Sequence, residues 1–241
     1  MKNMAIEASV LEENLDRIER EIAAACREAG RPRGDVSLMA VSKMHPVSAI
    51  RAAEALGVRL FGENRVQEFE EKREQLPENG SEFHFIGHLQ SNKAARAAEL
   101  FSSVDTLDSV SLAERLNQAA TRAARRLAVL LEIKLSPEAS KAGLEPESAE
   151  LSRLLERLPD LTGLELRGVM TVPPFLQDLS LVRPYFARLR KLRDELAAAH
   201  PRLCFDELSM GMSHDFAVAI AEGATQVRIG TALFGARVYP K

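Results

Sequence analysis

One lysine of the sequence stands where a buried strand should end. Lys43 follows Ser42 and the apolar run 36–41, so its ammonium group should be carried to the rim of a core. Desolvation there, and any neighbouring cation, would lower the pKa of an ammonium and favour the neutral amine that attacks an aldehyde. The alternative is a lysine that merely extends into solvent from a strand end. Position alone therefore makes Lys43 a candidate for Schiff-base chemistry.

Two glycine-hydroxyl segments near the C-terminus have the residue types of an anion site. They are Ser209-Met210-Gly211-Met212-Ser213 and Gly230-Thr231, each followed by a predicted helix. Glycine lets the backbone approach closely, and hydroxyls and N–H groups donate to an anion at a helix N-terminus. Ordinary helix capping is the alternative. A phosphate held here and a Schiff base on Lys43 would suit pyridoxal 5′-phosphate (PLP), although a phosphosugar aldolase would have the same two features.

The elements that must position these residues alternate regularly. Apolar strand-like runs are separated by segments of helical periodicity, after one N-terminal helix. Strands are predicted at 36–41, 58–61, 83–86, 101–107, 127–135, 164–170, 204–209 and 226–229, and helices at 6–29, 46–56, 63–75, 91–99, 111–125, 146–158, 179–199 and 216–222, with a short closing helix. Strands separated by helices pair in parallel with right-handed crossovers. Eight such units predict an α/β protein with a single (β/α)8 TIM barrel domain over residues 1–241, rather than an open doubly wound sheet.

In such a barrel the chemistry gathers at the C-terminal ends of the strands. The first strand would deliver Lys43 to that end, and the last two would deliver the glycine-hydroxyl segments. Loops after strands seven and eight often hold a phosphate together. Other strand ends deliver Gly62-Glu63-Asn64, Gly87-His88 and Met170-Thr171. Lys43 should therefore face a phosphate site across the barrel mouth.

Composition and charge argue against several other classes of protein. The chain has 241 residues, 46% hydrophobic and 28% charged, with a formal net charge of −3 and basic residues spread along the helices. That pattern argues against nucleic acid as a partner. No apolar run approaches the roughly 20 residues that span a bilayer, and the acidic N-terminus is not a signal peptide. We therefore expect a cytoplasmic protein with no membrane partner.

The cysteines and histidines predict no metal site. Cys26 and Cys204 form no C-x-x-C pair and are expected to be free thiols in a reducing compartment. His84 and His88 lack the carboxylate of the H-E-x-x-H pattern. The consecutive residues 213–215 contain serine, histidine and aspartate, but adjacent side chains cannot form a catalytic relay.

Six segments of the sequence together resemble one known family. They are AVSKMHPVSAI (40–50), FGENRVQEFEEK (61–72), FHFIGHLQSNK (83–93), EASKAGL (138–144), LRGVMTVPP (166–174) and LSMGMSHDFAVAIAEGATQVRIGTALFGAR (208–237). The family is that of the YggS-type PLP-binding proteins, also called PLP homeostasis proteins or proline synthetase co-transcribed homologues. The resemblance covers about residue 6 to Arg237. It implies the barrel of the alanine racemase N-terminal domain without that enzyme's second domain, and a role in vitamin B6 and amino-acid homeostasis.

The same resemblance implies which residues bind the cofactor. PLP would be held as a Schiff base on Lys43, with phosphate contacts on Ser209, Met210, Gly211, Gly230 and Thr231, the pyridine nitrogen beside Arg228, and Asn64, Met170 and His84 lining the cofactor. A guanidinium cannot accept a proton, so Arg228 would leave the pyridine nitrogen unprotonated. That weakens PLP as an electron sink and argues against transamination or decarboxylation.

The sequence departs from the family pattern at two positions near the expected mouth. Arg65 stands where an aromatic residue is frequent, and Lys134 stands where asparagine is common. Lys134 or Lys141 could serve as a secondary PLP acceptor, although solvated lysines at a strand end are the simpler interpretation.

Two functions are compatible with these residues. One is a PLP carrier or homeostasis protein without robust turnover, and the other is a PLP-dependent amino-acid racemase. A two-base racemase needs an acid or base on each face of the cofactor, and the two tyrosines, Tyr185 and Tyr239, follow no predicted strand end. We favour the carrier, and we expect a monomer with PLP and apo PLP-dependent enzymes as its partners.

Overall fold

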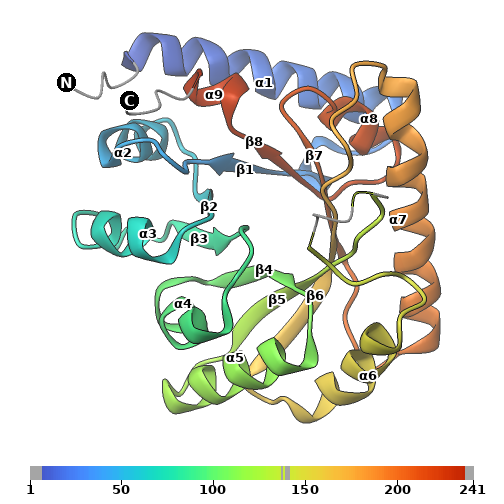
Figure 1. Cartoon of the computed structure of the whole chain (residues 1–241). Coiled ribbons are helices and arrows are strands. Elements are labelled where there is room, and N and C mark those ends of the chain that lie inside the picture. Colours follow the sequence, from blue (N-terminus) through green and yellow to red (C-terminus); the bar gives the residue numbers. More distant parts are fainter. Residues whose placement is uncertain (1–6, 137, 139–141, 237–241) are drawn as a thin grey trace.

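The strands of the protein close into one parallel barrel (Figure 1). The computed structural model describes residues 7–136, 138 and 142–236. In this part of the chain eight strands pair in sequence order, and β1 pairs with β8 to close the ring. They are β1 (Ser37–Val41), β2 (Leu60–Glu63), β3 (Glu82–Phe85), β4 (Ser103–Leu107), β5 (Leu127–Glu132), β6 (Leu164–Met170), β7 (Glu207–Met212) and β8 (Gln226–Ile229). The predicted TIM barrel is confirmed.

Helices connect the strands and surround the barrel (Figure 1). They are α1 (Ala8–Glu28), α2 (Val47–Ala55), α3 (Val66–Arg73), α4 (Ala94–Leu100), α5 (Val110–Arg122), α6 (Ala149–Arg157), α7 (Leu179–Ala199), α8 (Phe216–Ala221) and α9 (Thr231–Phe234), with short 3-10 turns at Arg33–Asp35, Ser91–Lys93 and Leu158–Asp160. Side-chain oxygens cap three of them, because Ser109, Ser148 and Asp178 accept hydrogen bonds from N–H groups of the first turns.

The additional N-terminal helix covers the two shortest helices of the barrel. In Figure 1, α1 runs along α8 and α9, and the contacts between these helices agree. Asn14 Nδ2 of α1 donates to the carbonyl of Leu233 at 3.0 Å. The buried residues of α1 recur at helical spacing: Leu11, Leu15, Ile18, Ile22, Ala25 and Cys26. Helix α1 therefore supplies the apolar cover that α8 and α9 are too short to provide.

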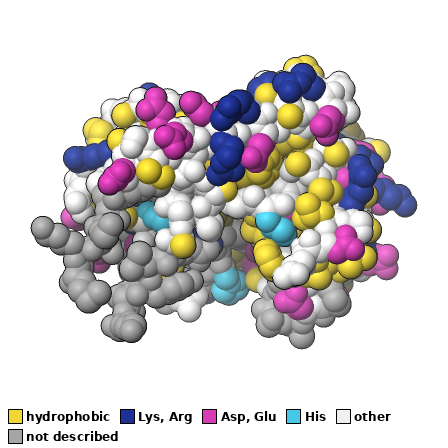
Figure 2. Space-filling view, turned by 90° about the horizontal axis from the view of Figure 1, so that it is seen from above, with side chains coloured by type: hydrophobic (Ala, Val, Ile, Leu, Met, Phe, Trp, Pro, Cys, Tyr) yellow, Lys and Arg dark blue, Asp and Glu magenta, His cyan; other side chains and the backbone are white. Residues whose placement is uncertain are grey.

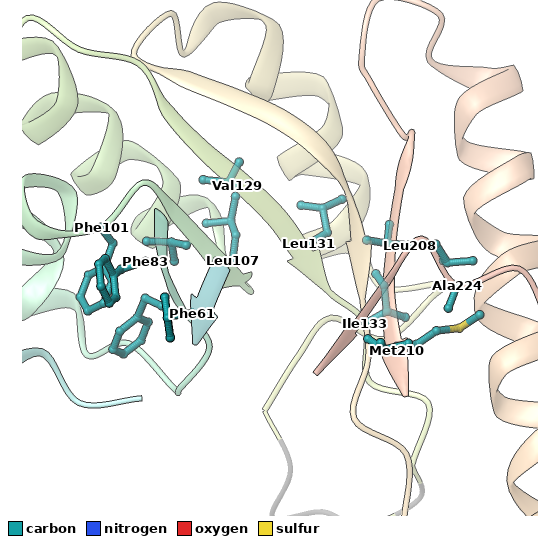
Figure 3. Packing of buried hydrophobic residues seen from close by; sticks show 14 of the residues in the cluster. Phe61, Phe83, Phe101, Leu107, Val129, Leu131, Ile133, Leu208, Met210 and Ala224 are labelled. Carbon is teal, nitrogen blue, oxygen red and sulfur yellow. The ribbon is translucent and has the colours of Figure 1, made fainter. Parts of the chain in front are cut away.

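The main apolar core lies between the outer side of the strands and the helices. Phe61 of β2 and Phe83 of β3 have ring centroids 5.3 Å apart. Phe69 of α3 lies 4.7 Å from Phe83 and 4.6 Å from Phe101. Figure 3 shows Phe61, Phe83 and Phe101 gathered on one side of the barrel. Each such aromatic pair contributes about 0.5–1.5 kcal/mol beyond burial, so the cluster fixes α3 against β2 and β3.

The predicted position of the seventh strand is wrong. It was expected at 204–209, whereas β7 runs from 207 to 212, so residues 209–211 lie inside the strand. Gly211 has φ +95°, and a Cβ there would lie 2.6 Å from Cβ of Ala219 in α8. Only glycine admits both this backbone angle and this close approach. The glycine that indicated a loop instead lets the strand continue beneath a helix.

Two other predicted boundaries also differ from the structure. Helix α3 begins at Val66 and not at residue 63, because Glu63 pairs with Phe85 as the last residue of β2. The fifth strand ends at Glu132 rather than at residue 135. Beyond it, Ile133 forms an isolated bridge to Leu144 in a later loop, and its N–H still donates to the Met170 carbonyl of β6 at 2.8 Å.

Candidate cofactor site

A pocket of about 590 Å³ opens at the C-terminal ends of the strands. This is the end at which TIM barrels carry their active sites, and the volume lies in the ordinary range for small-molecule pockets. Five of the predicted site residues line it: Lys43, Met170, Arg228, Gly230 and Thr231. Met212, Ser213, His214 and Phe175 line it as well. The structure thus brings together the lysine and the loops that follow β7 and β8.

Strand alternation explains why Lys43 reaches this pocket. Ser37 and Val41 of β1 line cavities at the two ends of the barrel interior, so this set of alternate residues faces inward. Lys43 continues the set just beyond the strand. Ser42 belongs to the opposite set, and its hydroxyl donates to Glu63 Oε1 at 2.7 Å on the helix side of the sheet. A shift of one residue would turn Lys43 away from the pocket.

Arg228 of β8 is the buried cation of the pocket. Its side chain is almost fully buried, with Nη1 donating to Ser209 Oγ at 2.7 Å and Nη2 to the Thr171 carbonyl at 2.7 Å. Burial lowers the pKa of the guanidinium, against the attraction of nearby carboxylates. Arginine nevertheless stays protonated in proteins. Arg228 is therefore a fixed, oriented positive charge at the floor of the site.

The loops after β7 and β8 are joined by Ser213, the last residue of the segment 209–213 that the sequence predicts as part of an anion site or as an ordinary helix cap. Ser213 Oγ accepts hydrogen bonds from the N–H groups of Gly230 at 3.3 Å and Ala232 at 3.2 Å. Both N–H groups thus converge on one oxygen, as they would on an oxygen of a bound anion. The helices that follow, α8 and α9, have only 6 and 4 residues, so the N–H groups available at this rim come from the loops and the first turns.

Three of the predicted phosphate contacts lie below these loops, within β7. The Ser209 hydroxyl is engaged with Arg228 and Gln226. The Met210 side chain is buried in the core outside the barrel. Gly211 lies where β7 passes so close to α8 that there is no room for a side chain. Ser209, Met210 and Gly211 stay predictions as ligand contacts. Met212, the last residue of β7, and Ser213, in the loop that follows it, reach the pocket.

Asn64 and His84 do not line the pocket with Lys43. Asn64 follows β2, and its Oδ1 is buried without a hydrogen-bond partner in the described part of the chain. His84 lines a separate cavity of about 410 Å³ at the opposite, N-terminal end of the barrel. The structure therefore does not bring His84 into the pocket with Lys43, and its contact with the cofactor stays a prediction. Ile86, two residues further along the chain, lines the pocket with Lys43, whereas His84 faces the other cavity.

His84 is instead part of a buried ion pair. Its Nδ1 lies 3.1 Å from Asp105 Oδ2, and Ser103 Oγ donates to Asp105 Oδ1 at 2.6 Å. Burial lowers the pKa of His84, but the charge and hydrogen bond of Asp105, with a hydrogen bond to Glu82, outweigh burial and raise it to about 10. The imidazolium is a structural cation.

From the ion pair of His84 and Asp105 we predict that the stability of the fold depends on pH. Because folding raises the pKa of His84 from 6.5 to about 10, its contribution is complete below about pH 6.5 and is lost as pH rises towards 10. Urea unfolding should show the free energy of unfolding falling across that interval. His84→Gln should flatten the slope, with His88→Gln, at an exposed position, as the control. An equally steep fall in His84→Gln would contradict the assignment.

Glu132 is a residue of the mouth that the sequence analysis missed. It ends β5 opposite Met170, which lines the pocket. Burial and the neighbouring charge of Asp108 raise its pKa to about 7, against the lowering effect of Arg228. The sequence signal that could have indicated Glu132 is its position directly after the apolar run 127–131.

The remaining predicted positions lie outside the pocket or outside the described residues. Arg65 is an exposed residue at the start of α3. Lys134 Nζ lies 3.8 Å from Glu145. Tyr185 packs against the apolar core from α7. Lys141 and Tyr239 fall on residues that are not described. Among described residues, no group of three or more His, Cys, Asp or Glu could hold a metal ion.

Comparison with known proteins identifies the family. The family model described as "Alanine racemase, N-terminal domain" matches residues 14–238. A curated relative from Aquifex aeolicus, named "Pyridoxal phosphate homeostasis protein", is 43% identical over 94% of this chain and 98% of its own length. This chain belongs to the pyridoxal phosphate homeostasis proteins. The resemblance stated from the sequence motifs is confirmed.

Solved structures of these and related proteins agree with the fold. PipY from Synechococcus elongatus, solved with PLP bound, is 40% identical, has a TM-score of 0.82, and is matched over 93% of this chain and 100% of that one. An alanine racemase from Clostridium difficile shares only 17% identity at a TM-score of 0.72 and shows the fold alone, with 58% of that chain covered. The pyridoxal phosphate homeostasis proteins thus share the barrel with the larger racemases.

The surface gives two further observations. Figure 2 views the molecule from the α1 side, and there the Lys and Arg side chains are interspersed with Asp and Glu rather than gathered into one basic patch. Within the described residues, no helix is both long and apolar enough to cross a membrane.

Proposed function

We propose that this chain binds PLP in the strand-end pocket, with Lys43 as the Schiff-base lysine, and that it serves in PLP homeostasis. The observation that carries the proposal is that Lys43, Arg228 and the loops after β7 and β8 line one pocket. The curated relatives named pyridoxal phosphate homeostasis protein, and PipY solved with PLP, support the choice of cofactor.

The polar groups at the mouth fit a phosphorylated aldehyde. His214 lines the pocket, and its buried Nε2 has no hydrogen-bond partner within the described residues. The same is true of Asn64 Oδ1 and Asp215 Oδ2, whose residues follow β2 and β7 without lining the pocket themselves. Buried polar atoms are normally paired, so unpaired ones beside a pocket are suited to a polar ligand or its water. The pocket volume also suits a ligand of this size. The residues present therefore fit PLP.

Each part of the pocket would have its own role. Ser213, Gly230 and Thr231 would hold the phosphate through hydroxyl and N–H donors. Bound PLP supplies an aldehyde carbon that a neutral amine can attack. Lys43 would provide that amine from the opposite side of the mouth. Arg228 would stand beside the pyridine nitrogen and, having no acceptor, would keep it unprotonated. This arrangement anchors PLP firmly while it weakens the ring as an electron sink.

A carrier must also release its cargo, and we extend the proposal to delivery. The chain, acting as a cytoplasmic monomer, would supply PLP to apo forms of PLP-dependent enzymes. Support comes from the open mouth, where Phe175 lines the pocket and is 72% exposed. Its ring lies 4.5 Å from that of His214, so the contact at the rim is between two side chains that solvent or a partner can reach.

Reductive trapping tests the proposed lysine. Borohydride reduces a Schiff base to a stable amine, so treatment of the PLP-loaded protein should leave one phosphopyridoxyl group on Lys43. Peptide mass spectrometry locates the group. A phosphosugar aldolase would instead trap a sugar phosphate and carry no chromophore. Modification of Lys134 or another lysine, with Lys43 unmodified, would show that the lysine was assigned incorrectly.

A further inference from the structure

The residue before Lys43 is held by a buried lysine of α3. Lys72 Nζ donates to the backbone carbonyl of Ser42 at 3.1 Å and lies 2.8 Å from Glu63 Oε1. The same Glu63 oxygen accepts the Ser42 hydroxyl at 2.7 Å. Ser42, Glu63 and Lys72 are all buried. Both the backbone and the side chain of Ser42 are therefore fixed on the outer side of the sheet.

The residue after Lys43 is held by the same ammonium through a second carboxylate. The Met44 N–H donates to Glu68 Oε1 at 2.7 Å, and Lys72 Nζ lies 2.8 Å from that oxygen. Met44 has φ +64°, a left-handed angle that residues other than glycine rarely adopt. Such strain persists only where surrounding contacts impose it. The Glu68 acceptor is a contact that imposes it here.

We propose that Lys72 is a positioning residue for Lys43. An ammonium has three donors, and Lys72 meets three acceptors, Ser42 O, Glu63 Oε1 and Glu68 Oε1, within 3.1 Å. It thereby holds the chain on both sides of Lys43, and so aims the Lys43 side chain into the pocket. The inference rests on the proposed role of Lys43 in binding PLP.

Energetics favour positioning over simple stabilisation. A buried ion pair stabilises a fold no better than apolar residues of the same size, whereas removing one partner is costly. Burial raises the pKa of Glu63, and the charge and hydrogen bond of Lys72 oppose that rise. Burial acts in the same direction on Glu68, but there Lys72 and the Met44 N–H outweigh it and lower the pKa. Lys72 thus acts on both carboxyl groups in the direction that favours the ionised form.

Lys72 does not line the pocket that contains Lys43. It lines a groove on the outside of the barrel, formed with Met44 and Glu68 between α2 and α3. Its contacts with the chain beside Lys43 are the backbone groups of Ser42 and, through Glu68, Met44, and the proposed influence on bound PLP passes through them. This sets Lys72 apart from the groups that would touch the cofactor.

The test uses two measurements on the full chain. In the apo-protein, Lys72→Met should raise the hydrogen-exchange rate of the Met44 amide while amides of β5 stay protected. When PLP is added, covalent attachment should slow by on the order of tenfold or more, since misplaced reacting groups lose rate steeply. In that step Lys43 forms a C=N bond to the aldehyde carbon, and the aldehyde oxygen leaves with both amine hydrogens as water.

Two further variants keep the test decisive if Lys72→Met folds poorly. Glu68→Ala removes the carboxylate that links Lys72 to the Met44 N–H, while the contacts of Lys72 with Ser42 and Glu63 remain, and it should also slow attachment. Glu71→Ala, on the same helix and lining the same outer groove, is the matched control and should attach PLP at the wild-type rate.

The outcomes separate this inference from the proposed function. If Lys72→Met or Glu68→Ala attaches PLP at the wild-type rate, Lys72 does not position Lys43. If attachment slows while the Met44 amide keeps its protection, Lys72 acts by charge, and the inference is overturned as well. If Lys43→Ala itself retains the covalent link, the proposed function fails at its lysine, whatever the other variants show.

Discussion

Lys43→Ala should abolish the visible Schiff-base band of the PLP-loaded protein. The reason is that Lys43, just beyond β1, continues the inward-facing set of that strand into the pocket, while its neighbour Ser42 faces Glu63 on the other side. Alanine leaves the phosphate loops intact, so PLP should still bind weakly and show the spectrum of a free aldehyde. An absorption titration of both proteins with PLP measures the change.

The same substitution should remove the stabilisation that the cofactor provides. A ligand present at about 100 times its Kd stabilises the folded state by about 2.7 kcal/mol. PLP should therefore raise the melting temperature of the wild type much more than that of Lys43→Ala. Lys134→Ala is the control, because Lys134 is a partly buried lysine that follows β5 and pairs with Glu145. A Lys43→Ala protein with an unchanged band, or a Lys134→Ala protein that loses it, would refute the assignment.

Much of the fold could be predicted because its signals are local. Strand β6 and helix α7 have the bounds that the sequence predicts, 164–170 and 179–199. In each, one continuous hydrophobic pattern stands between clear breaks. The error at β7 has a tertiary cause. Gly211 resembles a loop residue in the sequence, but its positive φ and its approach to α8 belong to a strand that passes beneath a helix. No local pattern distinguishes those two uses of glycine.

The site was predictable at strand ends and not in the barrel interior. Lys43, Gly230 and Thr231 were found because the end of a strand can be read from the chain. That His84 lines the opposite cavity could not be predicted, because its depth in the barrel depends on the register between β2, β3 and β4. Glu132 was missed because its raised pKa arises from Asp108 and burial in the assembled barrel.

Arg228→Met should cost about 3–5 kcal/mol of unfolding free energy, the usual cost of removing one partner from a set of buried charges. The Ser209 hydroxyl and the Thr171 carbonyl would each lose a charged donor. Asp105, Asp215 and Glu132 would lose the cation whose field they share. Urea unfolding at several pH values measures this loss.

The pH profile gives this prediction a specific sign. Arg228 lowers the pKa of Glu132, which stands at about 7, so its removal should raise that pKa further. Because folding already raises the pKa of Glu132, its ionisation destabilises the fold as pH rises above about 4.5, and Arg228→Met should steepen this loss around neutral pH. Arg228→Lys keeps the positive charge but lacks the planar guanidinium that donates to both Ser209 and Thr171. Compared with Arg228→Met, it should therefore recover the wild-type pH dependence more fully than the wild-type free energy of unfolding. If Arg228→Met lowers the free energy of unfolding by the same amount at every pH, Arg228 and Glu132 are not coupled. In that event the charge of Arg228 would act on the pocket only through Ser209 and Thr171.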